Sequence, residues 1–324
     1  MKQHHTDTTK NFWVELPKPF YILAPMEAVT DVVFRHVVAQ AAAPDVWFSE
    51  FTNATGWAAA GDKAIGGRLI KTDDEHPIVA QLWGSAPEAM AQLAQHCATL
   101  GYHGIDINMG CPDKSATKSG GGAAMICNPD NAAEIIAAAK TSGLPVSVKT
   151  RLGYSRIDEW QAWLTHILRQ DIVNLTIHLR TKKEMSKVPA HFELIPAIKQ
   201  LRDEIAPHTL LTINGDIRDR AHGESLIAET GVDGIMIGRG VFHNPFAFSP
   251  NQSPRSMTTL LGLLNKQLDL YDKYALQTGR PYDTLKRFYK IYVRDFEGAA
   301  ELRDKLMHTK STDEVRALLT PLLQ

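Results

Sequence analysis

The chain has 324 residues, of which 44% are hydrophobic and 22% charged, and its formal net charge is −1. This composition excludes global disorder, and the balanced charge gives no whole-molecule reason to expect a polyanionic partner, so any such site must be local. Three cysteines are too few, and odd in number, for a disulfide framework. Residues 1–10 lack the apolar core of a signal peptide, and no apolar run is long enough to span a membrane. We therefore expect a soluble, cytoplasmic protein.

Eight short apolar segments with strand character follow one another along the chain. They span 20–24, 46–49, 77–82, 104–108, 145–149, 173–178, 210–214 and 234–238. Amphipathic, helix-like segments lie between them, among them 87–100, 129–142, 158–169, 192–205 and 219–230. Such alternation indicates parallel strands covered by helices. Eight repeats over roughly 250 residues favour a closed (β/α)8 TIM barrel over an open doubly wound sheet. No G-x-G-x-x-G follows the first strand, which argues against a dinucleotide-binding fold.

The composition changes to a polar, proline-bearing linker near residues 249–255. Beyond it the strand pattern stops, and 258–277, 282–295, 298–308 and 312–323 are predicted helices. We therefore predict a polar N-terminal extension (1–17), an α/β barrel domain (18–248), the linker, and a small all-helical domain (256–324) packed on the barrel.

The loop after the fourth strand combines several reactive side chains. Cys111 lies between Gly110 and Pro112, ahead of two lysines and the glycines at 120–122. Such a loop fits a reactive site, although a turn-rich connection with an incidental thiol explains it too. Cys97 and Cys127 are expected to pack in the protein.

Polar side chains also stand at the ends of the other strands. In a barrel of this type the C-terminal strand ends form one rim, which is the catalytic face. Any one of them has a structural explanation; His178, for example, could satisfy buried hydrogen-bonding groups. Together they predict a polar ring on one face of the barrel: Pro25, Met26, Glu27, Glu50, Gln81, Asn108, Lys149, His178, Asn214, Gly238 and Arg239.

Gly238-Arg239-Gly240 ends the eighth strand and precedes a predicted short helix from Val241. Barrels commonly build a phosphate site from their last two loops, with glycine amides, a helix N-terminus and here an arginine. Asn214-Gly215-Asp216 adds a tight turn beside it. A phosphate-bearing cofactor such as flavin mononucleotide (FMN) would fit, but spacing does not separate flavin from another phosphorylated ligand.

Basic residues gather at the predicted mouth and in the tail. Lys149 and Arg151 are two residues apart on an extended segment, so both could face the mouth. Around them stand Lys114, Lys118, Arg156, Arg180, Lys182, Lys183 and Lys187. In the tail, Arg287, Lys290 and Arg294 would share one helical face among aromatic residues. The pattern fits either solvated charges or a phosphate-backbone contact surface.

Metal and hydrolase sites are not indicated. The three cysteines lie far apart, there is no H-E-x-x-H, and no G-x-S-x-G occurs. We predict no metal.

An ordered set of motifs resembles the tRNA-dihydrouridine synthases, flavin enzymes that reduce particular uridines of tRNA. The resemblance covers roughly residues 18–248, and the helical tail is similar in kind. It rests on Ala24–Asp31 (APMEAVTD), Gln81–Gly84 (QLWG), Asp106–Pro112 (DINMGCP), Lys149–Arg151 (KTR), Asn214–Asp216 (NGD) and Gly238–Gly240 (GRG).

The resemblance implies FMN as cofactor, NADPH as reductant and tRNA as substrate. It implies flavin contacts from Pro25, Met26, Glu27, Gln81, Lys149, His178, Asn214, Gly215, Asp216, Gly238 and Arg239. Cys111 would be the catalytic acid, and Asn108 and Arg151 would contact the uracil. From the basic clusters we add Arg180, Arg287, Lys290 and Arg294 as predicted tRNA contacts.

The expected reaction delivers a hydride from reduced flavin to uracil C6 and a proton to C5. A thiol with an ordinary pKa of about 8.5 is mostly protonated at pH 7, which suits Cys111 as an acid rather than a nucleophile. Two positions depart from the family pattern: Ala28 and Leu179 stand where glycine is usual. An FMN barrel reductase of a small molecule, of the dihydroorotate dehydrogenase type, and a non-catalytic RNA-binding barrel are the alternatives. We expect a monomer, and the sequence does not specify which uridine is reduced.

Overall fold

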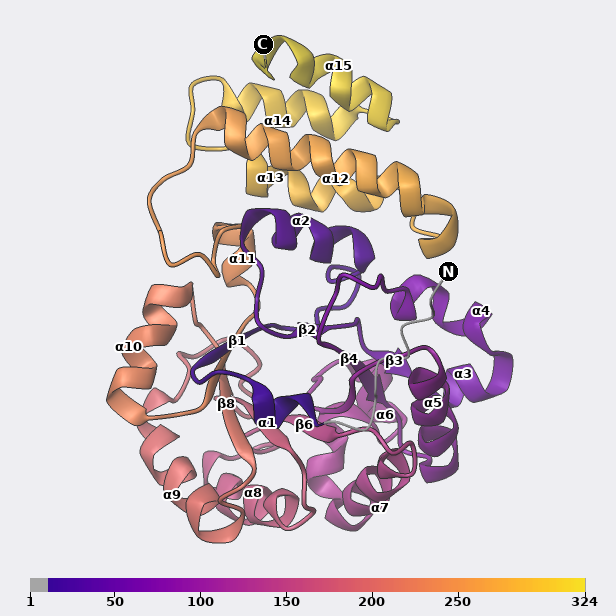
Figure 1. Cartoon of the computed structure of the whole chain (residues 1–324), viewed down its shortest axis with the longest axis vertical. Helices are drawn as coiled ribbons and strands as arrows, with labels where there is room; N and C mark the ends of the chain where they lie inside the picture. The colour runs from indigo at the N-terminus through magenta and orange to yellow at the C-terminus, as the bar shows by residue number, and fades with distance from the viewer. Residues whose placement is uncertain (1–10, 324) are drawn as a thin grey trace.

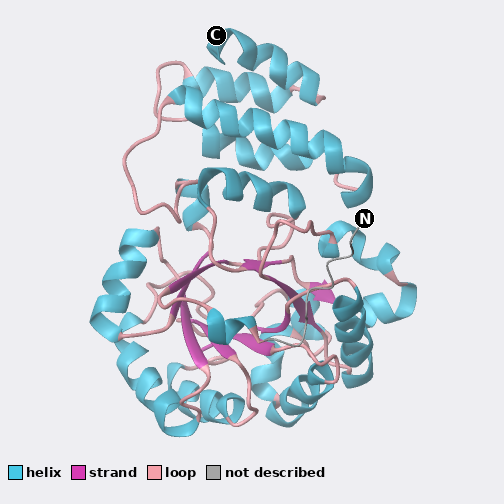
Figure 2. Ribbon diagram, viewed as in Figure 1, coloured by secondary structure: helices cyan, strands magenta, loops and turns pink. Residues whose placement is uncertain are grey.

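The computed structural model describes residues 11–323, and its centre is a ring of parallel strands (Figure 2). The ring contains β1 (Phe20–Leu23), β2 (Trp47–Phe48), β4 (Ile78–Trp83), β5 (Gly104–Met109), β6 (Val146–Arg151), β7 (Asn174–His178), β8 (Leu210–Asn214) and β9 (Gly234–Ile237). Their order is β1-β9-β8-β7-β6-β5-β4-β2, and a bridge between Ile22 and Val46 joins β1 to β2. The eight predicted strands and the nearly closed (β/α)8 barrel are thus confirmed.

The strand register aligns the polar strand ends. Asn108 on β5 lies beside Lys149 on β6, Arg151 lies beside His178 on β7, and His178 lies beside Asn214 on β8. Because all these strands are parallel, their polar C-terminal ends meet on one face of the barrel.

Helices cover the outside of the barrel: α2 (Val32–Ala42), α5 (Pro87–Thr99), α7 (Pro129–Lys140), α8 (Trp160–Leu168), α9 (Ile195–Ile205) and α10 (Arg220–Thr230). Local sequence explains their limits. Asp31 caps α2 by accepting from the Phe34 amide, Asn128 caps α7, and Gly231 ends α10 in the left-handed conformation. Two of them are preceded by short 3-10 turns, η3 (Ile157–Glu159) before α8 and η4 (Phe192–Leu194) before α9.

Several short elements were not predicted. They are α1 (Phe12–Glu15), β3 (Thr52–Asn53), α3 (Ala54–Ala60), α4 (Asp62–Ile65), η1 (Gly66–Leu69), α6 (Lys114–Lys118) and η2 (Gly122–Cys127). One or two helical turns are too short to show hydrophobic periodicity, and local caps such as Asn53 before α3 and Asp113 before α6 define them instead.

Apolar side chains fill the N-terminal half of the barrel interior. Phe20, Ile22, Phe48 and Met236 form one buried cluster, and Trp13 of α1 packs against them. Buried polar side chains begin above this layer, with Gln81, Asp106 and Ser147. The apolar layer therefore closes one end of the barrel, and the polar site opens at the other.

The chain after the barrel is helical, as predicted. After the short α11 (Gly240–His243) it continues through α12 (Met257–Thr278), η5 (Tyr282–Phe288), α13 (Tyr289–Tyr292), α14 (Ala299–His308) and α15 (Thr312–Leu323). α12 packs on α2, so the C-terminal helices sit on one side of the barrel (Figure 1). Phe34 of α2 stacks on Phe288 of η5 with ring centroids 4.9 Å apart, and Phe242 of α11 lies 6.2 Å from Phe34. Such aromatic pairs each contribute about 1 kcal/mol beyond their buried area.

The predicted helix over 282–295 is wrong. The segment forms a 3-10 helix and then a single α-helical turn that ends at Tyr292, because Val293 leaves the helical conformation. Arg294 therefore does not extend a helical face with Arg287 and Lys290, and it pairs with its neighbour Asp295 at 3.3 Å. In residues 11–323, no helix combines the length and apolar character of a membrane span.

Candidate active site

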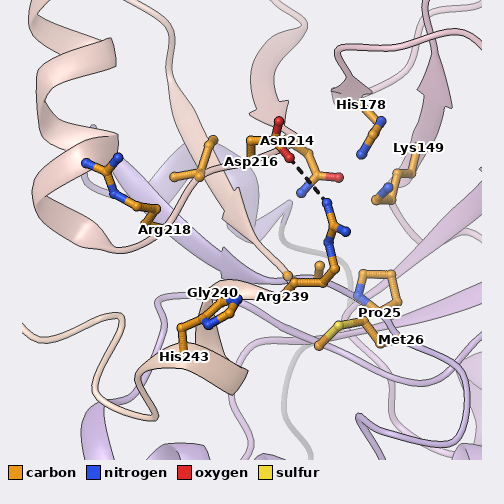
Figure 3. A pocket seen from close by; sticks show the side chains of 14 residues that line it. Pro25, Met26, Lys149, His178, Asn214, Asp216, Arg218, Arg239, Gly240 and His243 are labelled. Carbon is orange, nitrogen blue, oxygen red and sulfur yellow. Dashed lines mark hydrogen bonds and ion pairs between the residues drawn. The ribbon is translucent and has the colours of Figure 1, made fainter. Parts of the chain in front are cut away.

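Two cavities open at the C-terminal face of the barrel. The first, of about 450 Å³, is lined by nine residues of the predicted flavin set: Pro25, Met26, Lys149, His178, Asn214, Gly215, Asp216, Gly238 and Arg239 (Figure 3). The second, of about 580 Å³, is lined by Glu27, Phe51, Asn53, Arg68, Trp83 and Cys111 among others. Two predicted flavin contacts, Glu27 and Gln81, do not line the first cavity.

The loops after the last two strands form the end of the first cavity where we predicted a phosphate site. Arg239 and the glycines on either side of it follow β9, and a Cβ atom on Gly240 would lie 2.1 Å from the Arg218 carbonyl oxygen. Only glycine allows these loops to approach so closely. Asp216 accepts from Arg239 Nη2 at 3.2 Å and so holds this guanidinium beside the cavity (Figure 3).

Arg180, a predicted tRNA contact, is not at the surface. Its side chain is 2% exposed, and its guanidinium pairs with Asp216 and donates to the Val188 carbonyl at 2.6 Å. The buried Arg180 thus fixes Asp216, which in turn orients Arg239.

Lys149 and His178 lie at the inner wall of the first cavity (Figure 3). Burial, together with the neighbouring Arg151, lowers the pKa of Lys149 to about 8. Burial and the charges of Arg151 and Lys149 hold the pKa of His178 well below its ordinary value, so this imidazole is neutral at pH 7. Within residues 11–323, its buried Nδ1 has no hydrogen-bond partner. That free ring nitrogen suits a polar cofactor seated in the cavity.

A chain of hydrogen bonds runs from the barrel interior to Cys111. The buried Asp106 carboxylate accepts from Ser147 Oγ at 2.6 Å and from Gln81 Nε2 at 2.7 Å. Gln81 Oε1 accepts from Asn108 Nδ2 at 3.1 Å. Asn108 Oδ1 then accepts from the amides of Gly110 and Cys111, at 3.1 and 2.9 Å. Asn108, predicted to contact uracil, is therefore engaged in holding the cysteine loop.

Arg151 holds the same loop from the other side. Its Nε donates to the Gly110 carbonyl at 2.7 Å, and its Nη1 donates to the carbonyls of Thr181 and Met185 at 3.1 and 3.0 Å. The side chain is mostly buried. Like Asn108, this predicted uracil contact is bonded to loop backbone.

The glycine run packs directly against the cysteine. Gly122 has φ +55°, and a Cβ atom there would lie 2.7 Å from the Cys111 carbonyl oxygen, which accepts from the Ala123 amide at 2.9 Å. A Cβ atom on Gly121 would lie 2.9 Å from the Trp83 ring. Glycine is thus required where this loop folds back on Cys111.

The Cys111 thiol is half-buried at the wall of the second cavity. Burial raises the pKa of Cys111, and the nearby charges of Arg151 and Lys149 oppose this effect only in part. The thiol is therefore neutral at physiological pH and holds a proton that it can donate.

The loop after β1 carries one departure from the family pattern. Ala28 has φ +56°, a conformation in which glycine is favoured, and its amide donates to Glu50 Oε1 at 2.5 Å. Glu27, beside it, pairs with Arg68. The second departure, Leu179, is buried outside the left-handed region, so its conformation requires no glycine.

Several lining residues were missed from the sequence. Arg218 and His243 line the first cavity, and Phe51, Asn53, Arg68 and Trp83 line the second. Arg218 follows the Asn214-Gly215-Asp216 turn and His243 follows Arg239 by one helical turn, which are signals that could have identified both. In the part of the chain that the structure describes, no group of three or more His, Cys, Asp or Glu side chains could hold a metal ion.

Ionisable groups, perturbed pKa values and two cavities at the C-terminal mouth define a (β/α)8-barrel enzyme. The family model described as dihydrouridine synthase matches residues 22–324. The chain belongs to the dihydrouridine synthase family.

The relatives extend over almost the whole chain. It is 60% identical over 312 residues to a "Probable tRNA-dihydrouridine synthase 2" of Bacillus subtilis (strain 168), covering 96% of each chain. It is 58% identical over 311 residues to a "Probable tRNA-dihydrouridine synthase" of Staphylococcus aureus (strain Mu50), covering 96% of this chain and 95% of the relative.

A solved structure shares the fold alone. 6-Hydroxypseudooxynicotine amine oxidase from Pseudomonas geniculata N1 aligns with a TM-score of 0.52 at 12% identity, over 70% of this chain and 46% of that one.

We expect Gly122→Ala to destabilise the protein more than Gly143→Ala. Both glycines have positive φ, but a Cβ atom at Gly143 meets open space, whereas at Gly122 it meets the Cys111 carbonyl. Both variants incur strain on the order of 1–2 kcal/mol, and Gly122→Ala adds a clash costing about 1–3 kcal/mol. Urea unfolding measures the difference, and mass spectrometry of Cys111 alkylation reports the displaced loop. Equal unfolding free energies and alkylation rates for the two variants would contradict this view of the glycine run.

We expect Lys149→Met to stabilise the cofactor-free protein at pH 7, and the gain to shrink as the pH rises. The pKa of Lys149 is lowered from 10.5 to about 8, so between these values the unfolded chain binds a proton that the folded chain does not. The penalty for burying this ammonium therefore disappears as pH rises through that window. Unfolding free energies of both proteins at several pH values test this, with the exposed Lys305→Met as control. A difference that stays constant from pH 7 to 10 would show that Lys149 is not buried as described.

Proposed function

We propose that the protein is a tRNA-dihydrouridine synthase that reduces the C5–C6 double bond of particular uridines, with Cys111 as the proton donor. The observation that carries this proposal is a neutral thiol held on a fixed loop at the mouth of a barrel, close to an anion-binding cavity. Membership in the dihydrouridine synthase family and the names of the relatives support it. The same family membership disfavours a small-molecule reductase and a non-catalytic barrel.

FMN is the proposed cofactor. Gly215, Gly238 and Arg239 would hold its phosphate, while Lys149 and the free ring nitrogen of His178 would contact the flavin. Pro25, Met26, Asn214 and Asp216 complete this set of lining residues. Bound FMN, once reduced by NADPH, supplies the hydride for C6 of the uracil. The glycine-rich loops, the lining side chains of Arg218 and Arg239, and the unpartnered imidazole nitrogen are consistent with a phosphorylated aromatic ligand.

The proton for C5 would come from the Cys111 sulfur, which becomes a thiolate and then recovers a proton from solvent. As the proton and hydride add across the double bond, negative charge develops on the uracil carbonyls. The charges of Lys149 and, less directly, Arg151, which both act on Cys111, would stabilise that developing charge. Asn108 and Arg151 would act on the reaction chiefly by holding the Cys111 loop.

Uridine in folded tRNA would have to be turned out into the mouth, since the thiol lies at a cavity wall. We propose that the helical domain (256–324), joined to the barrel (18–248) by the linker 249–255, contacts the tRNA backbone. The exposed Lys290 and the basic side chains at the rim, Lys114, Lys118, Lys182 and Lys183, are the proposed phosphate contacts, with Arg287 and Arg294 at the edge of that surface. A monomer working in the cytoplasm fits this substrate.

Mapping dihydrouridine in the tRNAs of a strain that lacks this protein tests the function directly. The expected result is the loss of dihydrouridine at one position or a small set of positions, restored by the intact gene. Purified protein should show the absorption of bound flavin and should form dihydrouridine on an unmodified transcript with NADPH. An unchanged map, together with a protein that binds no flavin, would refute the proposal.

We expect Cys111→Ala to retain flavin and tRNA binding while losing most dihydrouridine formation. Removing an acid that donates a proton in the transition state lowers the rate by about 10²–10⁴-fold. The raised pKa of Cys111 predicts that the rate of tRNA reduction by pre-reduced enzyme holds steady past pH 8.5 and falls only at higher pH, as the thiol ionises. Cys127 is exposed, so the expectation that it packs in the protein is wrong, and it lines neither cavity. Cys127→Ala therefore serves as the control. Full activity of Cys111→Ala would exclude the assigned acid.

A further inference from the structure

The loop that follows β1 is strained, and it borders both cavities. Pro25 and Met26 line the first cavity, and Glu27 lines the second. The next residue, Ala28, has φ +56°. A left-handed conformation costs a non-glycine residue about 1–2 kcal/mol, so it persists only where surrounding contacts hold it.

Both backbone polar groups of Ala28 are held by side chains far away in the sequence. Its N–H donates to Oε1 of Glu50, which follows the end of β2 by two residues, at 2.5 Å. Its carbonyl oxygen accepts from Arg287 Nη1 at 3.0 Å, across 259 residues of sequence. Ala28 is thus held on one side by the barrel and on the other by the C-terminal helices.

Glu50 is itself held by the C-terminal helices. Arg280 Nη2 lies 2.7 Å from each carboxylate oxygen of Glu50, whose side chain is 1% exposed. The other ionisable groups that act on Glu50 include the carboxylates of Asp31 and Glu27, which repel it. Arg68, which pairs with Glu27, also acts on Glu50 through its charge, but Arg280 is the cation in direct contact with this buried carboxylate. Without Arg280, Glu50 would either bind a proton or leave its place beside Ala28.

The segments that carry these two arginines pack on the barrel. η5, which carries Arg287, packs on α2 through the stacked rings of Phe288 and Phe34, and α12 leads directly to Arg280. α2 begins four residues after Ala28, and Thr30 Oγ1, just ahead of it, accepts from the Met26 amide at 2.8 Å. The position of the C-terminal helices on α2 is thereby transmitted to the loop at the cavities.

We propose that Arg280 and Arg287 are positioning residues that, together with Glu50, impose the left-handed conformation of Ala28 and so shape the cofactor cavity. The proposal rests on the proposed function for its catalytic consequence, but the loop conformation does not depend on it. The C-terminal helices then have a second task beyond contacting tRNA, because they set the geometry of the Pro25–Ala28 loop even when no tRNA is bound.

The test compares Arg280→Met, Arg280→Lys and Arg287→Met with the unaltered protein. Amide hydrogen exchange of the cofactor-free protein measures how firmly the Pro25–Ala28 loop is held. FMN titration without tRNA measures the affinity of the cavity for the cofactor. We expect Arg280→Met to speed exchange at the Ala28 amide and to weaken FMN binding about tenfold, with kcat lowered and KM for tRNA little changed. Arg280→Lys keeps the charge and should recover part of the loss. Arg287→Met should have a smaller effect, since its guanidinium bonds one carbonyl at an exposed position.

Ala28→Gly separates positioning from simple damage to the fold. Glycine adopts positive φ without strain, so adding this change to Arg280→Met should restore much of the FMN affinity. Arg316→Met is the matched control, because Arg316 pairs with Asp269 and Asp272 inside the C-terminal helices and not with the loop. It should leave FMN affinity and loop exchange unchanged.

Two outcomes would overturn the proposal. One is Arg280→Met with unchanged loop exchange and FMN affinity but a raised KM for tRNA, which would make Arg280 a tRNA contact alone. The other is a failure of Ala28→Gly to recover any affinity. If the loop responds as expected while the unaltered protein forms no dihydrouridine, the proposed function fails and the positioning remains.

Discussion

The ionised carboxylate of Asp106 sets the direction of the hydrogen-bond chain on which the site depends. A carboxylate only accepts, so Gln81 must present its amino group to Asp106 and its carbonyl to Asn108. Asn108 must then turn its carbonyl toward the Gly110 and Cys111 amides. Burial raises the pKa of Asp106 to about 6, which still leaves it charged at neutral pH. One buried charge thereby orients two amides and places the thiol, and the surrounding apolar barrel keeps water from competing.

The cations at the mouth fall into two groups: some are bonded to loop backbone or to Asp216, and others line the first cavity. Arg151 and Arg180 are buried and bonded to loop carbonyls or to Asp216, so they fix the loops. Lys149 and Arg239 line the first cavity, where we propose that the cofactor binds. Burial, reinforced by the neighbouring charge of Arg151, lowers the pKa of Lys149 and holds that of His178 well below its ordinary value. Arg151, which does not line the cavity, thus contributes to its electrostatic environment together with burial and the lining cations.

The barrel and the location of its site could be predicted because they depend on local patterns. Short apolar strands ending in Asn108, Lys149, His178 and Asn214 imply a polar rim once the strands are parallel. The destination of each long side chain could not be predicted. Arg151 was expected at the substrate and turns to Gly110, because a chain of that length can reach any of several carbonyls at a loop-rich face. The helix expected over 282–295 failed because buried aromatic contacts outweighed helical propensity there.

The junction between β1 and β2, where the barrel closes, lies beside contacts with residues that are synthesised much later. These two strands are joined by a bridge at Ile22 and Val46, whereas β1 and β9 are paired along four residues. Near this junction, Ala28 accepts a hydrogen bond from Arg287, which lies 259 residues later in the sequence. Glu50 accepts from Arg280, which lies 230 residues later. During synthesis the loop after β1 is therefore made early, whereas the two arginines that bond to Ala28 and Glu50 are made late. The contacts of Arg280 and Arg287 with Glu50 and Ala28 can therefore form only after the C-terminal helices have been made and have packed on the barrel.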